Sequence, residues 1–323
     1  MEAPTLRDVY QAKKTIAPHI ARTPLHYSAG LSELLSAEVY LKHEEYLPLG
    51  AFKQRGGVNL LANLTEEERA AGLITASTGN HGQSVASACR MFGVRAMVCL
   101  PENANPNKVK AMETLGAELI FHGENFDAAR MHGLQLSREE GYRFVHPVNE
   151  PLLIAGVATA SLETIEDLPD VQVLVVPLGG GSGVSGACIV AKSIDPSMEV
   201  LAVQSEQSPA GYRSWKEGKI VEAQNETFAE GVATGTGYEL AQQIISDLLD
   251  DFLLVNDDDI RRAVATLIDK AHTLAEGAGA TALAGALKYP EKVKGKKVAI
   301  TVSGSNTTIE QLRRALDAYQ TRS

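Results

Sequence analysis

The chain has 323 residues, of which 44% are hydrophobic and 22% charged, and its formal net charge is −10. These values describe a folded protein with a large core, and the length suggests two domains. The negative charge, with no run rich in lysine or arginine, argues against nucleic acid as a partner. No apolar run reaches the roughly 18 to 20 residues of a membrane span, and no signal peptide is recognisable. We therefore expect a cytoplasmic protein that binds neither membranes nor nucleic acids.

Short apolar runs typical of strands alternate with stretches of helical length. We predict helices at 6–20, 82–92, 106–115, 126–140, 151–168, 184–194 and 308–319. We predict strands at 39–41, 73–75, 95–100, 117–121, 143–145, 171–176, 200–203 and 297–302. Several strands are apolar throughout, which indicates burial on both faces. The pattern predicts an α/β fold of open, twisted parallel sheets with helices on both faces.

The distribution of these elements indicates two α/β domains with a cleft between them. Residues 65–148 form a compact set of α/β units and are expected to make a small domain. Residues 1–60 together with 149–323 are expected to make a large one. Within the large domain, residues 205–237 lack periodicity and are expected to form loops with short elements.

The three cysteines lie in apolar stretches. Cys89, Cys99 and Cys188 show neither the spacing of a metal site nor that of a disulfide framework. We expect buried free thiols, as in a reducing compartment.

A lysine, Lys53, follows Gly50 and Phe52 at the expected start of a helix. The positive end of a helix dipole and partial burial both lower the pKa of an amine. Such an amine is neutral often enough to attack a carbonyl carbon. The alternative is an ordinary surface lysine.

A polar turn follows the strand predicted at 73–75. Ser77, Thr78, Gly79, Asn80 and His81 supply hydroxyls, an amide and free backbone N–H groups at a helix N-terminus. This combination is typical of a site that binds a carboxylate. A simple helix cap is the alternative, and a lone histidine is more often structural than catalytic.

A glycine-rich turn follows the strand predicted at 171–176 and precedes a helix. Its residues are Gly179, Gly180, Gly181, Ser182 and Gly183. Backbone N–H groups in such a turn, with a helix dipole behind them, bind phosphate. The same segment also fits the G-x-G-x-x-G pattern of dinucleotide sites, with Glu206 as the acidic residue. A turn that binds nothing is the third interpretation.

A similar turn at 303–306, containing Ser303, follows the last predicted strand. In open α/β sheets, such turns at the carboxyl ends of strands meet at the binding crevice. The three turns and Lys53 are therefore expected to surround one ligand.

Six motifs in this order and spacing resemble the pyridoxal-phosphate enzymes of fold type II, with a fold like that of the tryptophan synthase β subunit. They are AFKQRGG, STGNHGQ, GGGSG, AEGVATG, AEGAGA and SGSN. Within that group, the chain is most similar to threonine and serine dehydratases (ammonia-lyases) and serine racemase. The likeness spans nearly the whole chain. It displaces the dinucleotide interpretation, which explains one turn and gives Lys53 no role.

The resemblance implies a cofactor, pyridoxal 5′-phosphate, and a role for each motif. Lys53 would bind the cofactor as a Schiff base, with Phe52 beside the ring. Asn80 would hydrogen-bond the ring oxygen, Ser303 the ring nitrogen, and Gly231 would lie against the ring. The backbone amides of Gly179, Gly180, Gly181, Ser182 and Gly183 would hold the phosphate.

The resemblance also implies a reaction. Ser77, Thr78, Gly79, Asn80 and His81 would bind the substrate carboxylate in the small domain, and Lys53 would remove the Cα proton. The expected product is a 2-oxo acid with ammonia, formed from a small β-hydroxy amino acid, L-threonine or L-serine. The alternatives are serine racemisation, dehydration of phenylserine or hydroxyaspartate, and, more distantly, a nicotinamide-dependent oxidoreductase or a binding protein without catalysis.

The chain departs from the family pattern at three positions. Ser182 replaces a glycine, which is expected to keep the N–H group and to add a hydroxyl bond to phosphate. Thr78 replaces the serine that serves racemisation, which disfavours that activity without excluding it. Gln204 stands where a cation site would have its first carboxylate, so we expect no metal. Outside these departures, Glu276 is expected to lie near the substrate or a cation, with a helix cap as the alternative. Family members also suggest a homodimer or homotetramer.

Overall fold

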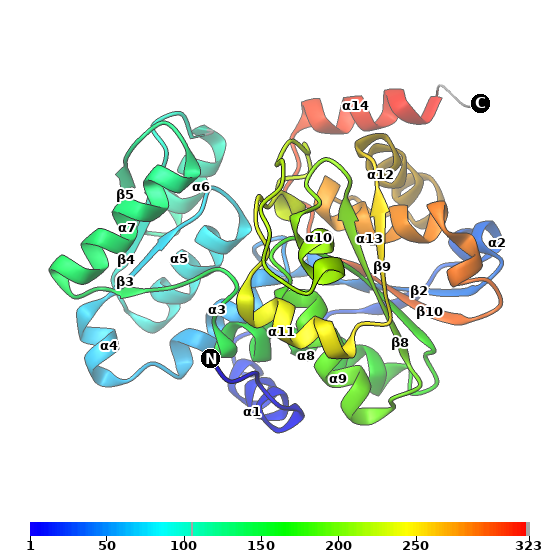
Figure 1. The fold of residues 1–323 in the computed structure, drawn as a ribbon, viewed down its shortest axis with the longest axis horizontal. Helices are drawn as coiled ribbons and strands as arrows, with labels where there is room; N and C mark the ends of the chain where they lie inside the picture. Colours follow the sequence, from blue (N-terminus) through cyan, green and yellow to red (C-terminus); the bar gives the residue numbers. More distant parts are fainter. Residues whose placement is uncertain (105, 321–323) are drawn as a thin grey trace.

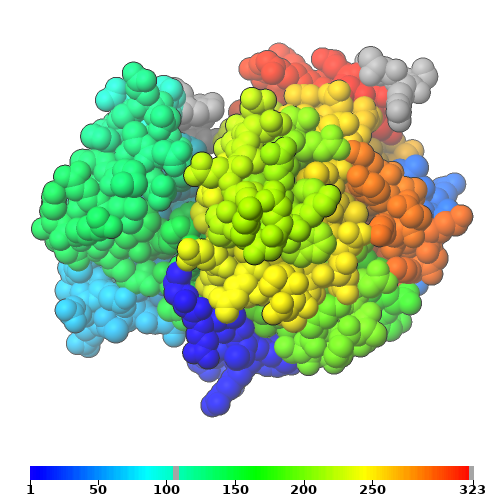
Figure 2. All heavy atoms as spheres, in the orientation of Figure 1, coloured from blue at the N-terminus to red at the C-terminus, as the bar shows by residue number. Residues whose placement is uncertain are grey.

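The computed structural model describes residues 1–104 and 106–320. It contains two separate β-sheets with helices packed on them (Figure 1). The larger sheet has six strands in the order β1-β2-β10-β7-β8-β9, and the smaller has four in the order β5-β4-β3-β6. In Figure 2, the teal residues of the smaller sheet region form a lobe beside the yellow-green residues of the larger one. The domain boundaries at 60/65 and 148/149 remain a prediction.

The six-stranded sheet is parallel except at one edge. Its strands are β1 (Leu25–Tyr27), β2 (Glu38–His43), β7 (Val173–Pro177), β8 (Glu199–Ser205), β9 (Asp251–Val255) and β10 (Lys297–Val302). The first of these pairs antiparallel with β2, whereas the other pairings are parallel. The buried strand β7 (Val173–Pro177) is apolar along its length, as expected for a strand covered on both faces.

Helices cover both faces of this sheet. One core contains alternate strand residues such as Val173 and Val175, and the other contains Leu174 and Val176. The helices of the first face are α2 (Ala29–Leu35), α12 (Asp257–Ala271) and α13 (Gly277–Lys288), with α14 (Ile309–Gln320) outside α12. The helices of the second face are α1 (Leu6–Ile16), α8 (Pro151–Asp167), α9 (Ser182–Ile194) and α11 (Glu239–Leu248).

The four-stranded sheet is parallel throughout and is also covered on both faces. Its strands are β3 (Leu73–Ala76), β4 (Ala96–Leu100), β5 (Glu118–Phe121) and β6 (Arg143–Phe144). In β4, Ala96, Val98 and Leu100 face one side, while Met97 and Cys99 face the other. The first side packs on α5 (Asn80–Phe92) and α6 (Pro106–Thr114), and the second on α7 (Phe126–Glu140). Helix α3 (Lys53–Ala62) packs between α5 and α8, and α4 (Glu66–Ala71) precedes β3.

The predicted elements are present, with shifted ends. The first helix ends at Ile16 instead of residue 20, and the helices predicted from 82 and 184 begin two residues earlier, at Asn80 and Ser182. Both early starts are polar residues, which carry no hydrophobic periodicity. The segment 205–237 consists of loops with short elements, as predicted, and the longest of these is α10 (Ala210–Glu217). The three cysteines are buried free thiols, as predicted.

The edge strands β1 and β9 were not predicted. The first, Leu25–Tyr27, is only three residues long and largely exposed, so no apolar run marks it. The second, Asp251–Val255, begins with an acidic residue and is short. No helix in the described part of the chain is long and apolar enough to cross a membrane.

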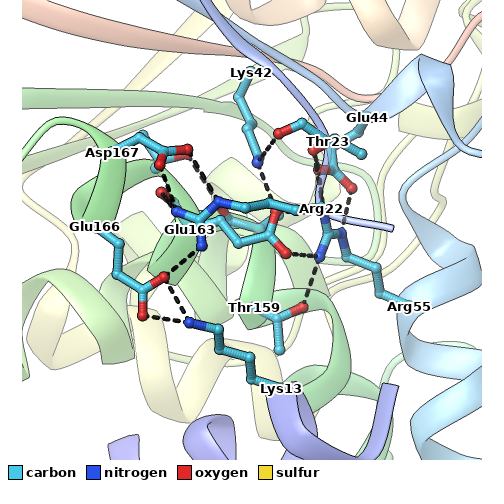
Figure 3. Close-up of polar contacts among 12 residues, drawn as sticks. Lys13, Arg22, Thr23, Lys42, Glu44, Arg55, Thr159, Glu163, Glu166 and Asp167 are labelled. Atoms are coloured by element: carbon cyan, nitrogen blue, oxygen red, sulfur yellow. Dashed lines mark hydrogen bonds and ion pairs between the residues drawn. The ribbon is translucent and has the colours of Figure 1, made fainter. Parts of the chain in front are cut away.

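A buried cluster of charged side chains joins the lysine-bearing helix to the large sheet (Figure 3). Arg55 of α3 is 0% exposed. Its Nε donates to Glu44 Oε2 at 2.7 Å, and its Nη1 donates to Glu163 Oε1 at 2.8 Å. Lys42 of β2 donates to Glu163 Oε2 at 2.7 Å and to the Thr23 carbonyl at 2.8 Å. We call Lys42, Glu44, Arg55 and Glu163 the buried charge cluster.

The buried charge cluster contains two cations and two carboxylates, so its charges balance. Burial alone would lower the pKa of Arg55, but Glu44 and Glu163 offset this and raise it above its ordinary value. Burial alone would raise the pKa of Glu163, but Arg55 and Lys42 lower it below its ordinary value. Arg55 and Glu163 therefore stay charged at neutral pH, and removing one partner leaves an uncompensated charge inside the protein.

Replacing Arg55 by alanine is expected to lower the free energy of unfolding by about 3–5 kcal/mol, because buried Glu44 loses its charged partner and Glu163 keeps only Lys42. Denaturant unfolding followed by circular dichroism measures this loss. Arg55→Lys keeps the positive charge, so its free energy of unfolding is expected to lie between those of the unmodified protein and Arg55→Ala. The matched control is Arg95→Ala, whose partner Glu118 is exposed, with side chains 51% and 55% accessible; its expected change is much smaller, because exposed ion pairs contribute little to stability. Equal, small losses for the Arg55 and Arg95 variants would contradict the assignment.

Candidate active site

A cavity of about 360 Å³ lies where the predicted site residues converge. Its wall is built from the ends of β3, β7 and β10 and the starts of α3, α5 and α9. All of the site residues predicted from the sequence line it: Phe52, Lys53, Ser77, Thr78, Gly79, Asn80, His81, Gly179, Gly180, Gly181, Ser182, Gly183, Gly231 and Ser303. The four-stranded and six-stranded sheet regions both contribute to this wall. The volume falls in the range of small-molecule sites.

Lys53 is the first residue of α3, and it lines the cavity. Its Nζ donates to Ser182 Oγ at 2.8 Å and lies 3.4 Å from the Pro147 carbonyl oxygen. Desolvation by burial lowers the pKa of Lys53 to about 8. About a tenth of this amine is therefore neutral at pH 7, far more than for an ordinary lysine, and a neutral amine attacks carbonyl carbons.

The glycine-rich turn forms an anion site in front of α9. Gly181 occupies the N-cap position with φ +106°, a left-handed conformation that favours glycine, and no side chain caps the helix. A Cβ added at Gly179 would lie 2.2 Å from the Gly231 carbonyl oxygen, a backbone atom, so the two backbone segments approach too closely for a side chain at this position. The helix N-terminus thus presents backbone N–H groups to the cavity, which fits a phosphate.

The hydroxyl of Ser182 has a partner that the sequence did not indicate, because its Oγ accepts a hydrogen bond from Lys53 Nζ. The hydroxyl keeps its own proton to donate, so the expected bond to phosphate stays a prediction. Ser182 is buried, so this contact connects the anion site directly to the amine. The dinucleotide interpretation loses its acidic residue, since Glu206 forms an ion pair with Lys288.

The turn after β3 faces the cavity as the N-terminus of α5. Gly79 occupies the N-cap position without a side-chain cap, which leaves helix N–H groups directed at the cavity. The Gly79 N–H itself donates to Ser77 Oγ at 3.2 Å. An anionic group of a ligand is therefore accommodated here by the first turn of the helix.

His81 is held in a neutral state that suits a structural role. Thr75 donates its hydroxyl to the Val145 carbonyl at 2.8 Å, so it must accept from His81 Nε2 at 3.0 Å. Burial, reinforced by Lys53, lowers the pKa of His81 to about 3. The imidazole therefore carries its proton on Nε2 and stays uncharged at neutral pH.

Glu276 lines the cavity and accepts a hydrogen bond from Asn80 Nδ2 at 2.7 Å. It occupies the N-cap position of α13, but its side chain makes no capping bond. The structure therefore does not support the helix cap for this residue and places it at the cavity, where a position near the substrate stays a prediction. Ser303 is buried, and its Oγ lies 3.4 Å from the Ala278 carbonyl oxygen.

Several lining residues were missed or received no role in the sequence analysis. Phe126, Val148 and Tyr238 had no motif to mark them, whereas Glu230 and Thr234 belong to the AEGVATG motif, of which only Gly231 was given a role. Among the described residues, no group of three or more histidine, cysteine, aspartate and glutamate side chains is placed to hold a metal. Gln204 is buried, and its Oε1 accepts from the Tyr212 N–H at 3.0 Å.

Comparison with known proteins gives consistent matches across the chain. A family model described as "Pyridoxal-phosphate dependent enzyme" matches residues 16–304. The L-threonine ammonia-lyase of Thermotoga maritima is 40% identical over 314 residues, which cover 97% of this chain and 78% of that protein. The catabolic L-threonine dehydratase of Escherichia coli K12 is 35% identical over 308 residues, or 94% of each chain.

Solved structures share the fold over nearly the whole chain. Threonine deaminase isoform 2 of Solanum lycopersicum superposes with a TM-score of 0.91 at 30% identity, covering 98% of this chain and 94% of that one. Serine racemase of Dictyostelium discoideum superposes with a TM-score of 0.89 at 34% identity, covering 94% and 99%.

The lowered pKa of Lys53 predicts its reactivity in the chain freed of any bound ligand. Acetic anhydride, which reacts with the neutral amine, is expected to label Lys53 with a half-maximal rate near pH 8. An ordinary lysine reaches that point near pH 10.4. Peptide mass spectrometry across a pH series measures both the site and the midpoint. A midpoint above about pH 10 for Lys53 would show that the amine is not desolvated.

Proposed function

The chain belongs to the pyridoxal-phosphate dependent enzymes, and we propose that it dehydrates and deaminates L-threonine or L-serine to a 2-oxo acid and ammonia. The observation that carries this proposal is the position of Lys53. Its amine has a lowered pKa and lies at hydrogen-bond distance from Ser182 in the glycine-rich turn. The relatives named as threonine ammonia-lyase and threonine dehydratase support the substrate class.

The residues of the cavity fit pyridoxal phosphate. The turn at 179–183 would hold the phosphate by backbone N–H groups, and Lys53 would form the covalent link to the cofactor. Asn80 would donate to the ring oxygen, Ser303 would bond the ring nitrogen, and Phe52 and Gly231 would flank the ring. When bound, the cofactor supplies an electron sink for charge at Cα of an amino acid. A hydroxyl partner such as Ser303 does not enforce a protonated ring nitrogen, which favours elimination over transamination.

The chain's own groups would perform three tasks. The N-terminus of α5 binds the substrate carboxylate, with the hydroxyls of Ser77 and Thr78 beside it. Lys53 holds and moves the Cα proton, because a pKa of about 8 suits a general base near neutral pH. His81, neutral and bonded to Thr75, keeps the turn in place.

Serine racemisation is a second candidate, since serine racemase of Dictyostelium discoideum shares the fold at 34% identity. It requires a group that returns a proton to the other face of Cα, and Thr78 is the residue at that position in the motif. Its hydroxyl lines the cavity, but its methyl group restricts the hydroxyl to fewer orientations. Chiral chromatography of an L-serine reaction separates the two activities, because racemisation yields D-serine and elimination yields pyruvate.

We further propose two domains at the boundaries given above, supported by the two separate sheets, and a homodimer or homotetramer, supported by the family resemblance. A cytoplasmic location agrees with the three buried free thiols. Sedimentation velocity measures the oligomeric state.

The purified protein with its cofactor is expected to convert L-threonine to 2-oxobutanoate and ammonia, measured by coupling the oxo acid to a dehydrogenase. Lys53→Ala is expected to lower kcat/KM by at least about 10²–10⁴-fold, the contribution of a general acid–base group. The matched control is Lys110→Ala, whose side chain is 79% exposed; its activity is expected to stay at the unmodified level.

The outcome that contradicts this function is the absence of oxo acid from L-threonine, L-serine and bulkier β-hydroxy amino acids, with the cofactor demonstrably bound. Oxo acid from phenylserine or hydroxyaspartate alone would keep the reaction and change the substrate.

A further inference from the structure

Three polar side chains from separate elements form a chain of hydrogen bonds beside the cavity. Asn306, in the turn after β10, donates from Nδ2 to Asn80 Oδ1 at 2.8 Å. Asn80, at the start of α5, donates from Nδ2 to Glu276 Oε1 at 2.7 Å. Asn80 and Glu276 line the cavity, and Asn306 bonds the other end of the Asn80 amide. We call these three residues the amide relay.

The direction of the amide relay is set by a backbone carbonyl. The two ends of a carboxamide have similar shapes but opposite hydrogen-bonding properties. Asn306 Nδ2 also donates to the Leu49 carbonyl oxygen at 2.9 Å, and a carbonyl can only accept. Asn306 must therefore turn its NH₂ group toward Leu49 and Asn80. Asn80 must in turn present Oδ1 to Asn306, so its own NH₂ group lies on the side of Glu276 and the cavity.

The backbone around the amide relay is built to hold it. Ala51 and Gly304 form a β-bridge, and the Ser305 N–H donates to the Gly50 carbonyl at 2.9 Å. A Cβ at Gly304 would lie 2.6 Å from Glu276 Oε1, so only glycine leaves room for this carboxylate to reach Asn80. The turn after β10 is thereby fixed against the loop that carries Lys53, and the amide relay cannot shift without moving both.

We propose that Asn306 is a positioning residue, which holds the Asn80 amide so that an N–H group, and not Oδ1, faces the ring oxygen of the bound cofactor. This inference rests on the proposed contact between Asn80 and that oxygen. One N–H of Asn80 is used by Glu276, and the second is the donor for the cofactor. A reversed amide would turn an acceptor toward an oxygen that also accepts, which costs the hydrogen bond and adds repulsion.

The test reverses the amide relay and leaves Asn80 itself unchanged. Asn306→Asp offers only acceptors, so Asn80 gains a hydrogen bond by rotating its NH₂ group toward residue 306. Its Oδ1 then opposes the Glu276 carboxylate. Adding Glu276→Gln supplies a donor to that Oδ1, so the double variant regains a bonded relay that runs in the opposite direction. Glu276→Gln alone keeps the original direction, because the glutamine Oε1 still accepts from Asn80.

Two measurements on the cofactor-bound protein read out the direction. The first is the cofactor dissociation constant by equilibrium dialysis, and the second is the midpoint of the pH titration of the cofactor absorbance band. We expect Asn306→Asp to weaken cofactor binding about tenfold to 100-fold and to move the midpoint to higher pH, because a donor to a charged oxygen is lost. Ser305→Ala, in the same turn, is the control and should change neither.

The double variant separates positioning from structural support. We expect it to recover part of the thermal stability that Asn306→Asp loses, while its cofactor affinity stays at least about tenfold below that of the unmodified protein. Recovery of affinity together with stability would overturn the proposal, as would unchanged affinity in Asn306→Asp. Asn80→Ala tests the Asn80 contact separately from the role of Asn306. If Asn80→Ala leaves cofactor affinity unchanged, the proposed contact between Asn80 and the cofactor is wrong. If Asn80→Ala weakens cofactor binding and Asn306→Asp does not, only the role of Asn306 is wrong.

Discussion

The buried charge cluster is the constraint on which the position of the reactive amine depends. Arg55 lies two residues after Lys53 on α3, and its guanidinium bonds Glu44 after β2 and Glu163 on α8. Moving or rotating this helix would separate charges that have no water to solvate them, which costs several kcal/mol per ion. The network (Figure 3) therefore holds α3 in one orientation. Lys53, in the first turn of this helix, faces the cavity as a result.

The site is assembled from turns that begin helices, and these turns serve distinct purposes. Helix α9 begins within the glycine-rich turn, and the N-terminus of α5 faces the proposed carboxylate site. Lys53 lies between them in a desolvated position, bonded to Ser182. Helix dipoles favour anions at two ends of one cavity, while burial keeps a fraction of the amine neutral. A phosphate-bearing cofactor and an amino acid carboxylate fit this distribution of charge.

Much of this arrangement could be predicted from the sequence, because local residues determine it. Glycine and polar residues after apolar runs marked the turns, and the carboxyl ends of parallel strands bring such turns together. The sequence could not show which side chains would pair across long separations. Asn306 and Asn80 are 226 residues apart, and Asn80 and Glu276 are 196 apart. The contact between Lys53 and Ser182 was likewise not predicted, because the reach of Lys53 depends on how α3 packs. The strand β1 (Leu25–Tyr27) was missed since it is short and exposed.

The central claim is that Lys53 is the residue to which the cofactor attaches. Borohydride reduction of the cofactor-bound protein makes that attachment permanent, and peptide mass spectrometry then locates it. We expect the mass of the reduced cofactor on the peptide that contains Lys53 and on no other. A cofactor mass on a different lysine, or bound cofactor with Lys53 unmodified, would contradict the account.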